Sequence, residues 1–389
     1  MDIRSNTQIK KTSKMKKIIF VTATRADYGK LKSIILSIQK LKKFNVHVFV
    51  TGMHNLSAYG STFYEIKNDK VHNIKKFHNQ ILGENSSKIF SKTVLGFSKY
   101  VNKINPDLVV IHGDRIEPLA CAVVCCLNNI KLAHFEGGEL SGTIDEILRH
   151  SISKLSNIHF VTNSIAKKRL IQMGELSSSI FITGSPDVDL ILSNNLPSLY
   201  DVKKKYDIAF KSYAIALFHP VTTDIKNLKK YISNFIRSLK LSKENIVLIF
   251  PNNDLGSEVI IKEYKKIRNN NIKVFPSLRF EYYLTLLKNC KFIIGNSSSG
   301  IMEAPYYGVA TINIGDRQNN RANLESIINC SYESSKILRA IKKFSVTKKF
   351  TTSSFFGDGR SAAKLIKILK SKKIWKINNQ KQFRDIASF

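Results

Sequence analysis

Short apolar runs alternate with amphipathic stretches throughout the first half of the chain. Strands that are buried on both faces read as nearly continuous apolar runs, so these runs predict the strands of a parallel sheet. The stretches between them place apolar residues three and four apart, as helices do. The strands are predicted at residues 17–22, 44–50, 108–111, 130–135, 158–162 and 180–183. The helices are predicted at 31–41, 57–68, 91–104, from about 117, over 145–156 and at 165–173.

The same alternation starts again after residue 210. Regular alternation of strand and helix predicts a parallel sheet with helices on both faces. The chain therefore falls into two α/β lobes, each doubly wound, with a crossover at about 187–210. The second set of strands is predicted at residues 213–218, 245–250, 272–275, 291–294 and 310–314. The predicted divisions are a tail at 1–14, a first lobe at 15–186, a second lobe at 187–360 and terminal helices at 361–389 that pack back on the first lobe.

The two ends of the chain differ in pattern. Residues 1–14 are polar and patternless and precede Met15, which predicts a disordered tail or a start codon assigned too early. Residues 361–369 and 375–389 are predicted as helices.

Charged side chains follow two predicted strands of the first half. Asp114 comes after the strand at 108–111, and Glu136 comes after the strand at 130–135. Ligand crevices in open parallel sheets lie beyond the carboxyl ends of the strands, so we expect both carboxylates to face one crevice. Asp145 and Arg149 lie four apart on the next helix. Three carboxylates and an arginine at one crevice favour acid–base chemistry over the alternative that they cap helices.

A polar segment after the first strand carries Arg25 and Lys30. A strand that runs into a helix through such a segment has an anion-binding geometry. The segment lacks the G-x-G-x-x-G pattern, so a dehydrogenase-type dinucleotide site is not supported. His54 follows the second strand, where it either contacts substrate or serves as a polar loop residue.

The second half carries polar loops after successive strands. Ser297 and Ser298 lie in a glycine-flanked loop that lets backbone amides approach a phosphate. Glu303 follows, where it would accept hydrogen bonds from a ribose diol, and Arg317 would pair with a diphosphate. His219 follows an earlier strand, and a histidine in such a place is by itself more often structural than catalytic.

Length and composition narrow the alternatives. The chain has 389 residues, of which 43% are hydrophobic, enough for two domains. It has no apolar run of membrane-spanning length and no segment of signal-peptide type, which predicts a cytoplasmic protein without membrane insertion. The five cysteines lack zinc spacing and read as small buried residues, so no disulfide and no metal site is predicted. They are Cys121, Cys125, Cys126, Cys290 and Cys330.

The formal net charge of +33 raises the question of a nucleic acid or an anionic membrane as partner. Lysine is spread along the whole chain, and there is no arginine-rich block or RNA-binding signature. We therefore attribute the charge to a bias in the composition of the solvated surface, and no nucleic-acid partner is predicted.

Taken together, the motifs resemble the UDP-N-acetylglucosamine 2-epimerase family, and its hydrolysing branch in particular. The resemblance covers almost the whole chain. It implies a GT-B-like pair of lobes with the active site in the cleft between them and UDP held mainly by the second lobe. The non-hydrolysing branch carries His-Arg-Arg where this chain has His219-Pro220-Val221. The matching stretches are TRADYGKL, TGMH, HGDRIEPLA, HFEGGELSGTIDEILRH, GSPDVD, HPVTTD, PNNDLG, PSLRFEYYLTLLKNCKFIIGNSSSG and GDRQNNR.

The resemblance also implies residue roles, a cofactor-free reaction and an assembly. The family needs no metal or nicotinamide, and its members imply a homodimer or homotetramer. The implied catalytic residues are Asp114, Glu136, Asp145, Arg149 and His219. The implied UDP-sugar contacts are Arg25, Lys30, His54, Asn253, Phe280, Ser297, Ser298, Glu303 and Arg317.

The implied reaction converts UDP-N-acetylglucosamine and water to N-acetylmannosamine and UDP, the first step of bacterial sialic acid biosynthesis. Elimination of UDP would leave a 2-acetamidoglucal, which water then rehydrates with inversion at C2. The nearest alternative is a hydrolysing 2-epimerase of UDP-2,4-diacetamido-2,4,6-trideoxyglucose, on the route to legionaminic acid. Further alternatives are a GT-B glycosyltransferase and a non-catalytic regulator that binds nucleotide sugars.

Overall fold

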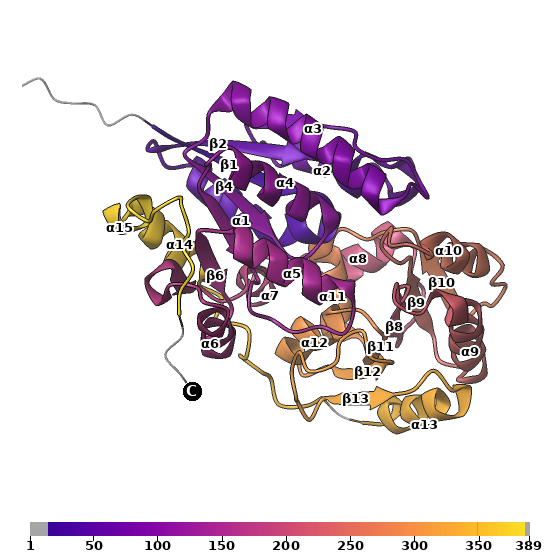
Figure 1. The fold of residues 1–389 in the computed structure, drawn as a ribbon. Coiled ribbons are helices and arrows are strands. Elements are labelled where there is room, and N and C mark those ends of the chain that lie inside the picture. Colours follow the sequence, from indigo (N-terminus) through magenta and orange to yellow (C-terminus); the bar gives the residue numbers. More distant parts are fainter. Residues whose placement is uncertain (1–14, 348, 386–389) are drawn as a thin grey trace, which may run out of the picture.

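Two lobes make up the chain, each built around a parallel sheet with helices on both faces (Figure 1). The computed structural model describes residues 15–347 and 349–385, so the tail predicted at 1–14 lies outside the described residues. The arrangement confirms the predicted fold class of two Rossmann-like doubly wound lobes.

The first sheet has seven strands in the order β3-β2-β1-β4-β5-β6-β7. Strands β2 and β3 are added on one side of β1, and strands β4 to β7 are added on the other side. Where the strand order changes direction, between β1 and β4, a crevice opens at the carboxyl ends of the strands. The strands are β1 (Lys16–Thr22), β2 (Phe44–Val50), β3 (Asn73–Lys76), β4 (Leu108–His112), β5 (Leu132–Phe135), β6 (Ile158–Val161) and β7 (Ile180–Ile182).

The second sheet has six strands in the order β10-β9-β8-β11-β12-β13, with its reversal between β8 and β11. The strands are β8 (Ala214–Leu217), β9 (Ile246–Ile249), β10 (Ile272–Phe275), β11 (Phe292–Gly295), β12 (Ala310–Ile314) and β13 (Ile327–Cys330).

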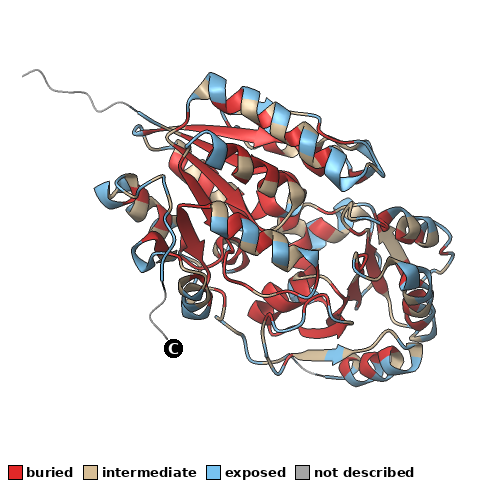
Figure 2. Cartoon of the chain, in the orientation of Figure 1, coloured by how far each residue is buried: buried red, intermediate tan, exposed pale blue. Residues whose placement is uncertain are grey.

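Alternate residues of each strand enter opposite core layers, because successive side chains of a strand point to opposite faces. In β1, Ile18 and Phe20 join one buried cluster, whereas Ile19 and Val21 join the other. Figure 2 shows the central strands of both sheets buried and the exposed positions on the outer faces of the helices.

The helices of the first lobe divide between the two faces of its sheet. Apolar residues of α1 and α14 share one core cluster, and those of α3, α4 and α5 share the other. The helices that cover the first sheet are α1 (Arg25–Gln39), α2 (Phe63–Asn68), α3 (Ser86–Ile104), α4 (Ile116–Leu127), α5 (Ile144–Leu155), α6 (Ser164–Gln172), α14 (Ser361–Lys370) and α15 (Lys372–Trp375).

The second lobe is layered in the same way. Helices α7, α8, α11 and α12 contribute to one core cluster, and α9, α10 and α13 contribute to the other. These helices are α7 (Pro186–Ile191), α8 (Leu199–Tyr206), α9 (Leu228–Leu241), α10 (Ser257–Lys265), α11 (Phe280–Asn289), α12 (Ser299–Met302) and α13 (Ser334–Ser345).

Several elements differ from the prediction. Strand β3 was missed because it is an edge strand with the polar sequence NIKK, of which only Ile74 is half-buried. The helix predicted at 57–68 is instead one 3-10 turn (Ser57–Tyr59) followed by α2. Strand β13, helix α13 and the crossover helices α7 and α8 were not predicted. The helix predicted at 375–389 is wrong for residues 376–385, which contain no helix. Of the five cysteines predicted to be buried, Cys126 is exposed and Cys330 is only partly buried.

The chain passes between the lobes twice at one place. The Ser185 amide donates to the Phe356 carbonyl at 2.7 Å, so the outgoing and returning segments lie side by side. A Cβ on Gly184 would lie 3.1 Å from the Cα of Gly357, and Gly184 has φ +80°, so both the close approach and the backbone favour glycine. The returning segment leads into α14, whose Leu365 is buried in the core of the first lobe.

A buried carboxylate, Glu175, ties the end of the chain to the first lobe. It accepts hydrogen bonds from His159 Nε2 at 3.0 Å, from Lys154 Nζ at 3.1 Å and from Lys381 Nζ. Burial alone would raise the pKa of Glu175, but the hydrogen bonds from His159 and Lys381 lower it to about 2. The carboxylate therefore stabilises the fold in its ionised form.

We expect Glu175→Gln to cost stability at neutral pH and to cost less as the pH falls. Because the folded pKa of Glu175 lies below its unfolded value, its contribution is present above about pH 4.5 and is lost as the pH falls toward 2. The contribution at stake is roughly 3 kcal/mol in the free energy of unfolding. Urea unfolding of both proteins at pH 6.5 and pH 3 measures the gap, and a gap that does not narrow contradicts the assignment.

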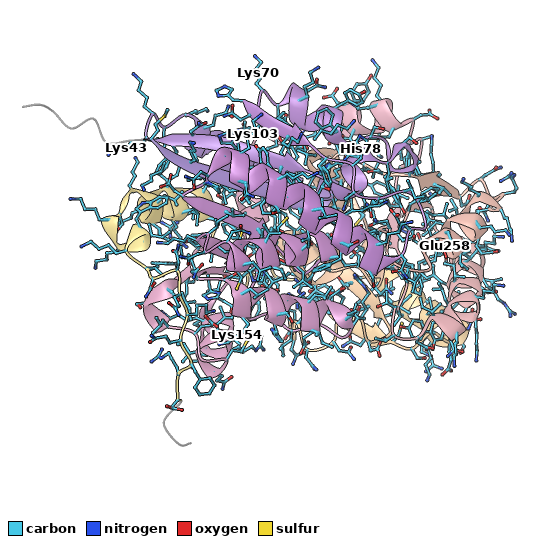
Figure 3. The ribbon with its side chains drawn as sticks, turned by 45° about the horizontal axis from the view of Figure 1, so that its top comes forward. Lys43, Lys70, His78, Lys103, Lys154 and Glu258 are labelled. Atoms are coloured by element: carbon cyan, nitrogen blue, oxygen red, sulfur yellow. The ribbon has the colours of Figure 1, made fainter. Side chains whose placement is uncertain are left out.

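The surface lysines lie on many different elements. Exposed ones include Lys43 after α1, Lys70 after α2, Lys103 of α3 and Lys154 of α5 (Figure 3). Among the described residues, no helix combines the length and the apolar character that crossing a membrane requires.

Candidate active site

A cavity lies between the lobes, where the carboxyl ends of the two sheets face each other. Most of the predicted site residues line it, although they come from segments far apart in the sequence. From the first lobe these are Arg25, Lys30, Asp114, Glu136 and Asp145, with His112 and Arg115. From the second lobe they are His219, Phe280, Ser297, Ser298, Glu303 and Arg317, with Tyr283 and Arg321.

Arg25 and Lys30 lie on the first turns of α1 rather than in a loop. The helix starts at Arg25 because Thr24 and Asp27 form a capping box, in which the Asp27 amide donates to Thr24 Oγ1 at 3.1 Å. The spacing of Thr24 and Asp27 was visible in the sequence. Arg25 donates to Glu65 of the first lobe and to Ser277 of the second, so it spans the mouth of the cleft.

Glu136 lies in a strained turn beside two cations and a histidine. Its φ is +65°, a left-handed conformation that non-glycine residues rarely adopt and that is often found at functional sites. Lys30 Nζ donates to Oε1 at 3.0 Å, His112 Nε2 lies 3.2 Å from Oε1, and Arg321 Nη2 lies 3.5 Å from Oε2. Burial raises the pKa of Glu136, but Lys30 and His112 outweigh it and hold the pKa well below its usual range.

Asp114 is ionised and forms an ion pair with Arg149. Arg149 is fully buried and donates to Asp114 Oδ2, to Ser141 Oγ at 3.0 Å and to the Glu139 carbonyl at 3.2 Å. Although burial raises the pKa of Asp114, Arg149 and Arg321 lower it overall. Arg149 is not among the residues that line the cavity, and its contact with Asp114 orients that carboxylate.

Asp145 pairs across the cleft with Arg317, whose Nη2 lies 3.0 Å from Oδ2. Burial raises the pKa of Asp145, and the neighbouring carboxylates of Asp114 and Asp254 raise it further against the opposing effect of Arg317. Asp145 is therefore more easily protonated than Asp114 or Glu136. Such opposed pKa shifts are the usual mark of an acid and a base in one site.

His219 is neutral and has a defined tautomer. The Asn252 amide donates to His219 Nδ1 at 3.1 Å, so Nδ1 is the acceptor and Nε2 carries the proton. Burial, followed by the nearby charge of Arg317, lowers the pKa of His219 to about 3. The ring lines the cavity as a hydrogen-bond donor without positive charge.

The serine loop follows β11 and is tightly packed. Gly295 has φ +138°, and a Cβ there would lie 1.7 Å from the Leu217 carbonyl oxygen, so only glycine fits. Ser297 and Ser298 line the cavity just before α12. Because α12 spans four residues, an anion here would be held by hydroxyls and individual amides rather than by the dipole of a long helix.

Glu303 follows α12 and points an unsatisfied oxygen into a buried space. Its Oε2 has no hydrogen-bond partner among the described residues. Burial, with Asp187 and Glu136 nearby, raises the pKa of Glu303 to about 7. A ligand hydroxyl that donates to Oε2 would satisfy this atom.

Two predicted ligand contacts lie outside the cavity. His54 is fully buried between Thr22 Oγ1 at 2.9 Å and Thr62 Oγ1 at 2.6 Å, and burial lowers its pKa to about 4. Asn253 Nδ2 donates to Gln80 Oε1 at 3.0 Å, and its Oδ1 accepts from Arg115. His54 therefore supports the first lobe internally, and Asn253 joins the two lobes.

Phe280 lines the cavity and also forms part of the lobe interface. A Cβ on Gly29 of α1 would lie 2.8 Å from the Phe280 ring and Cβ, so a larger residue would force the lobes apart. The glycine in the motif TRADYGKL thus allows the two lobes to pack closely.

Sequence reasoning missed four charged residues of the cleft. Arg115 Nη1 lies 3.1 Å from Asp254 Oδ1, and Arg321 Nη2 lies 3.0 Å from Glu139 Oε2, both across the lobes. All four lie in stretches that carry the resemblance. Their charge was the available signal, but their partners are more than 130 positions away in the sequence.

The site can perform acid–base chemistry beside a bound anion. Ionised Asp114 and Glu136 and the protonatable Asp145 lie in one cavity with Arg317, His219 and the serine loop. Among residues 15–347 and 349–385, no group of three or more His, Cys, Asp or Glu side chains is placed to hold a metal ion.

Comparison with known proteins points to one group. A family model described as UDP-N-acetylglucosamine 2-epimerase matches residues 36–370. A UDP-N-acetylglucosamine 2-epimerase of Neisseria meningitidis serogroup B is 44% identical over 96% of this chain and all of its own length. The polysialic acid biosynthesis protein P7 of Escherichia coli is 33% identical over 96% of this chain and 98% of its own.

A solved structure shares the fold. Methanocaldococcus jannaschii UDP-GlcNAc 2-epimerase, in complex with UDP-GlcNAc and UDP, superposes with a TM-score of 0.78 over 91% of this chain and 99% of that one. At 24% identity the likeness is one of architecture.

Proposed function

The chain belongs to the UDP-N-acetylglucosamine 2-epimerase family, and we propose that it is a hydrolysing member that converts UDP-N-acetylglucosamine and water to N-acetylmannosamine and UDP, the first step of sialic acid biosynthesis. The observation that carries the proposal is the convergence of Asp114, Glu136 and Asp145 on a cavity shared with Glu303 and Arg317 of the other lobe. The 44% identity to the Neisseria enzyme and the 33% identity to the polysialic acid protein support it.

In the proposed reaction a carboxylate takes the C2 proton, and the C2–H electron pair forms a C1–C2 double bond. The C1–O bond breaks at the same time, and its electron pair leaves with UDP. The 2-acetamidoglucal then gains water at C1 and a proton at C2 on the face opposite to the one deprotonated. Inversion therefore needs proton-transfer groups on both faces of the sugar.

The ionisation states support a division of roles. Glu136 and Asp114, whose pKa values are lowered, are the candidates for removing the C2 proton. Asp145, whose pKa is raised, is the candidate for returning one.

The leaving diphosphate is best stabilised by Arg317, by the Nε2–H of His219 and by the serine loop. Preorganised donors of this kind stabilise charge that develops in the transition state. Glu303 would accept hydrogen bonds from the ribose hydroxyls, which would satisfy its unpaired Oε2. In this proposal UDP is therefore held mainly by the second lobe.

One alternative substrate has support of its own. A UDP-N,N'-diacetylbacillosamine 2-epimerase (hydrolyzing) of Legionella pneumophila is 32% identical over 92% of this chain. This is the diacetamido-trideoxy sugar of the legionaminic acid alternative. The identity is lower than to the Neisseria enzyme, so UDP-N-acetylglucosamine remains the proposed substrate.

Incubation of the purified protein with each UDP sugar, followed by NMR of the products, tests the function. We expect N-acetylmannosamine and UDP, and product formed in D₂O should carry deuterium at C2, because the carboxylates exchange protons with the water that completes hydrolysis. In ¹⁸O-labelled water UDP should stay unlabelled. Label in UDP would mean attack at phosphorus and would contradict the elimination route.

We also propose a homodimer or homotetramer that acts in the cytoplasm and has no nucleic-acid partner. Leu95 of α3, Leu127 of α4 and Ile147 of α5 are exposed on helices that cover the same face of the first sheet, which supports self-association there. Exposed lysines occur on helices of both lobes, such as Lys103 of α3 and Lys240 of α9, which supports the absence of a dedicated nucleic-acid site. Light scattering should give a mass of at least twice 44.1 kDa, and a monomer would contradict the assembly.

A further inference from the structure

Asp187 is a buried carboxylate that the proposed mechanism does not use. It lies in the motif GSPDVD at the start of α7, is 1% exposed, and neither of its oxygens has a hydrogen-bond partner among the described residues. Burying a carboxyl group without hydrogen bonds is costly, so its place in the interior calls for an explanation.

The nearest cation to Asp187 is the one that holds Glu136. Lys30 Nζ lies 3.7 Å from Asp187 Oδ2 and 3.0 Å from Glu136 Oε1. The Lys30 side chain is itself only 8% exposed, so little solvent screens either contact. One ammonium is therefore shared unequally between two buried carboxylates.

The two partners of Lys30 come from different parts of the fold. Glu136 follows β5 in the first lobe, which also contains Lys30 on α1. Asp187 lies instead on α7, which packs on the second-lobe core through Val188 and Ile191. Tyr307 of the second lobe also donates to the Ile191 carbonyl at 3.0 Å. Asp187 thus contacts Lys30 from the point where the chain crosses between the lobes.

Asp189, two residues on, shows what a structural carboxylate looks like here. Its two oxygens accept from the Ser361 and Ala362 amides, each at 2.7 Å, and so hold the start of α14. Asp187 makes no such bond. Its position is instead explained by the ammonium that it faces.

We propose that Asp187 is a positioning residue that competes with Glu136 for the ammonium of Lys30 and so keeps that ammonium from neutralising Glu136. With Asp187 in place, Lys30 is drawn partly away, and Glu136 retains basicity for the C2 proton. Without it, Lys30 pairs with Glu136 alone. The inference rests on the proposed function, because it takes Glu136 as an acid–base group.

A double-mutant cycle tests this inference, with kcat measured at saturating substrate. We expect Asp187→Asn to lower kcat by about tenfold in the wild-type background and by less than about twofold in a Lys30→Met background, since residues that act through one another are not additive. Lys30→Gln serves as a second background if Lys30→Met does not fold. UDP affinity by calorimetry should change by less than about twofold in Asp187→Asn, which separates positioning from binding.

Asp189→Asn is the matched control on the same helix. It should lower the melting temperature but leave kcat within about twofold, because it releases α14 without touching Lys30. Equal losses from Asp187→Asn in both backgrounds, or no loss in either, overturn the inference while the function stands. A wild-type protein that does not turn over any UDP sugar overturns the proposed function itself.

Discussion

Glu136→Gln is expected to lower kcat by about 100-fold or more while UDP still binds, the usual scale for a lost acid–base group. The amide keeps the size of the side chain but cannot take a proton. In the wild-type protein Lys30, His112 and Arg321 surround this carboxylate and keep it ionised. Asp114→Asn should have an effect of similar size, because Asp114 is also ionised and faces the same cavity.

The measurement is a comparison of kcat with UDP affinity for both variants. Glu258→Gln is a suitable control, because Glu258 is an exposed carboxylate on α10, away from the cavity (Figure 3). Wild-type turnover in either variant would remove that carboxylate from the mechanism. A loss of UDP affinity as large as the loss of kcat would instead mean that the carboxylate serves binding.

Arg317→Ala and Glu303→Ala are each expected to weaken UDP binding by about 10- to 150-fold, that is, by roughly 1.5–3 kcal/mol for a lost charge-assisted hydrogen bond. Arg317 is buried at the cleft, where a diphosphate would meet it without a full shell of water. Its present partner is Asp145, so a diphosphate would compete with that carboxylate for the guanidinium. Glu303 offers its unsatisfied Oε2 to the ribose.

Calorimetric titration with UDP measures both effects directly. Arg237→Ala provides the control, since Arg237 is an exposed arginine of α9 in the same lobe. It removes the same charge from the second lobe without altering the cavity. Unchanged UDP affinity in both Arg317→Ala and Glu303→Ala would refute the placement of UDP on the second lobe.

Much of the architecture was predictable because parallel strands buried on both faces must be apolar along their whole length. That requirement made most strands visible as short runs, and it placed Asp114 and Glu136 just beyond the ends of β4 and β5. Strand β3 escaped because an edge strand can be polar. The start of α1 was misplaced although its capping box, Thr24 and Asp27, could be read from the spacing.

The side-chain partnerships were decided by the tertiary structure alone. Asp145 was predicted beside Arg149, four residues along one helix, yet it pairs with Arg317 of the other lobe while Arg149 turns inward to Asp114. The surroundings of each carboxyl group then decided which one holds a proton more readily. Burial raises the pKa of Asp145, whereas the surrounding cations lower that of Glu136.

The sequence by itself determined most of the strands and helices in their order, the two α/β halves and the strand ends at which the polar motifs lie, because local apolar periodicity encodes these features. The closing of one lobe on the other determined which charges meet. It joined Arg317 to Asp145 and Arg321 to Glu139, whereas packing within the first lobe joined Lys30 to Glu136 and buried His54. Contacts of this kind depend on the packing of distant segments, and no local pattern in the chain records them.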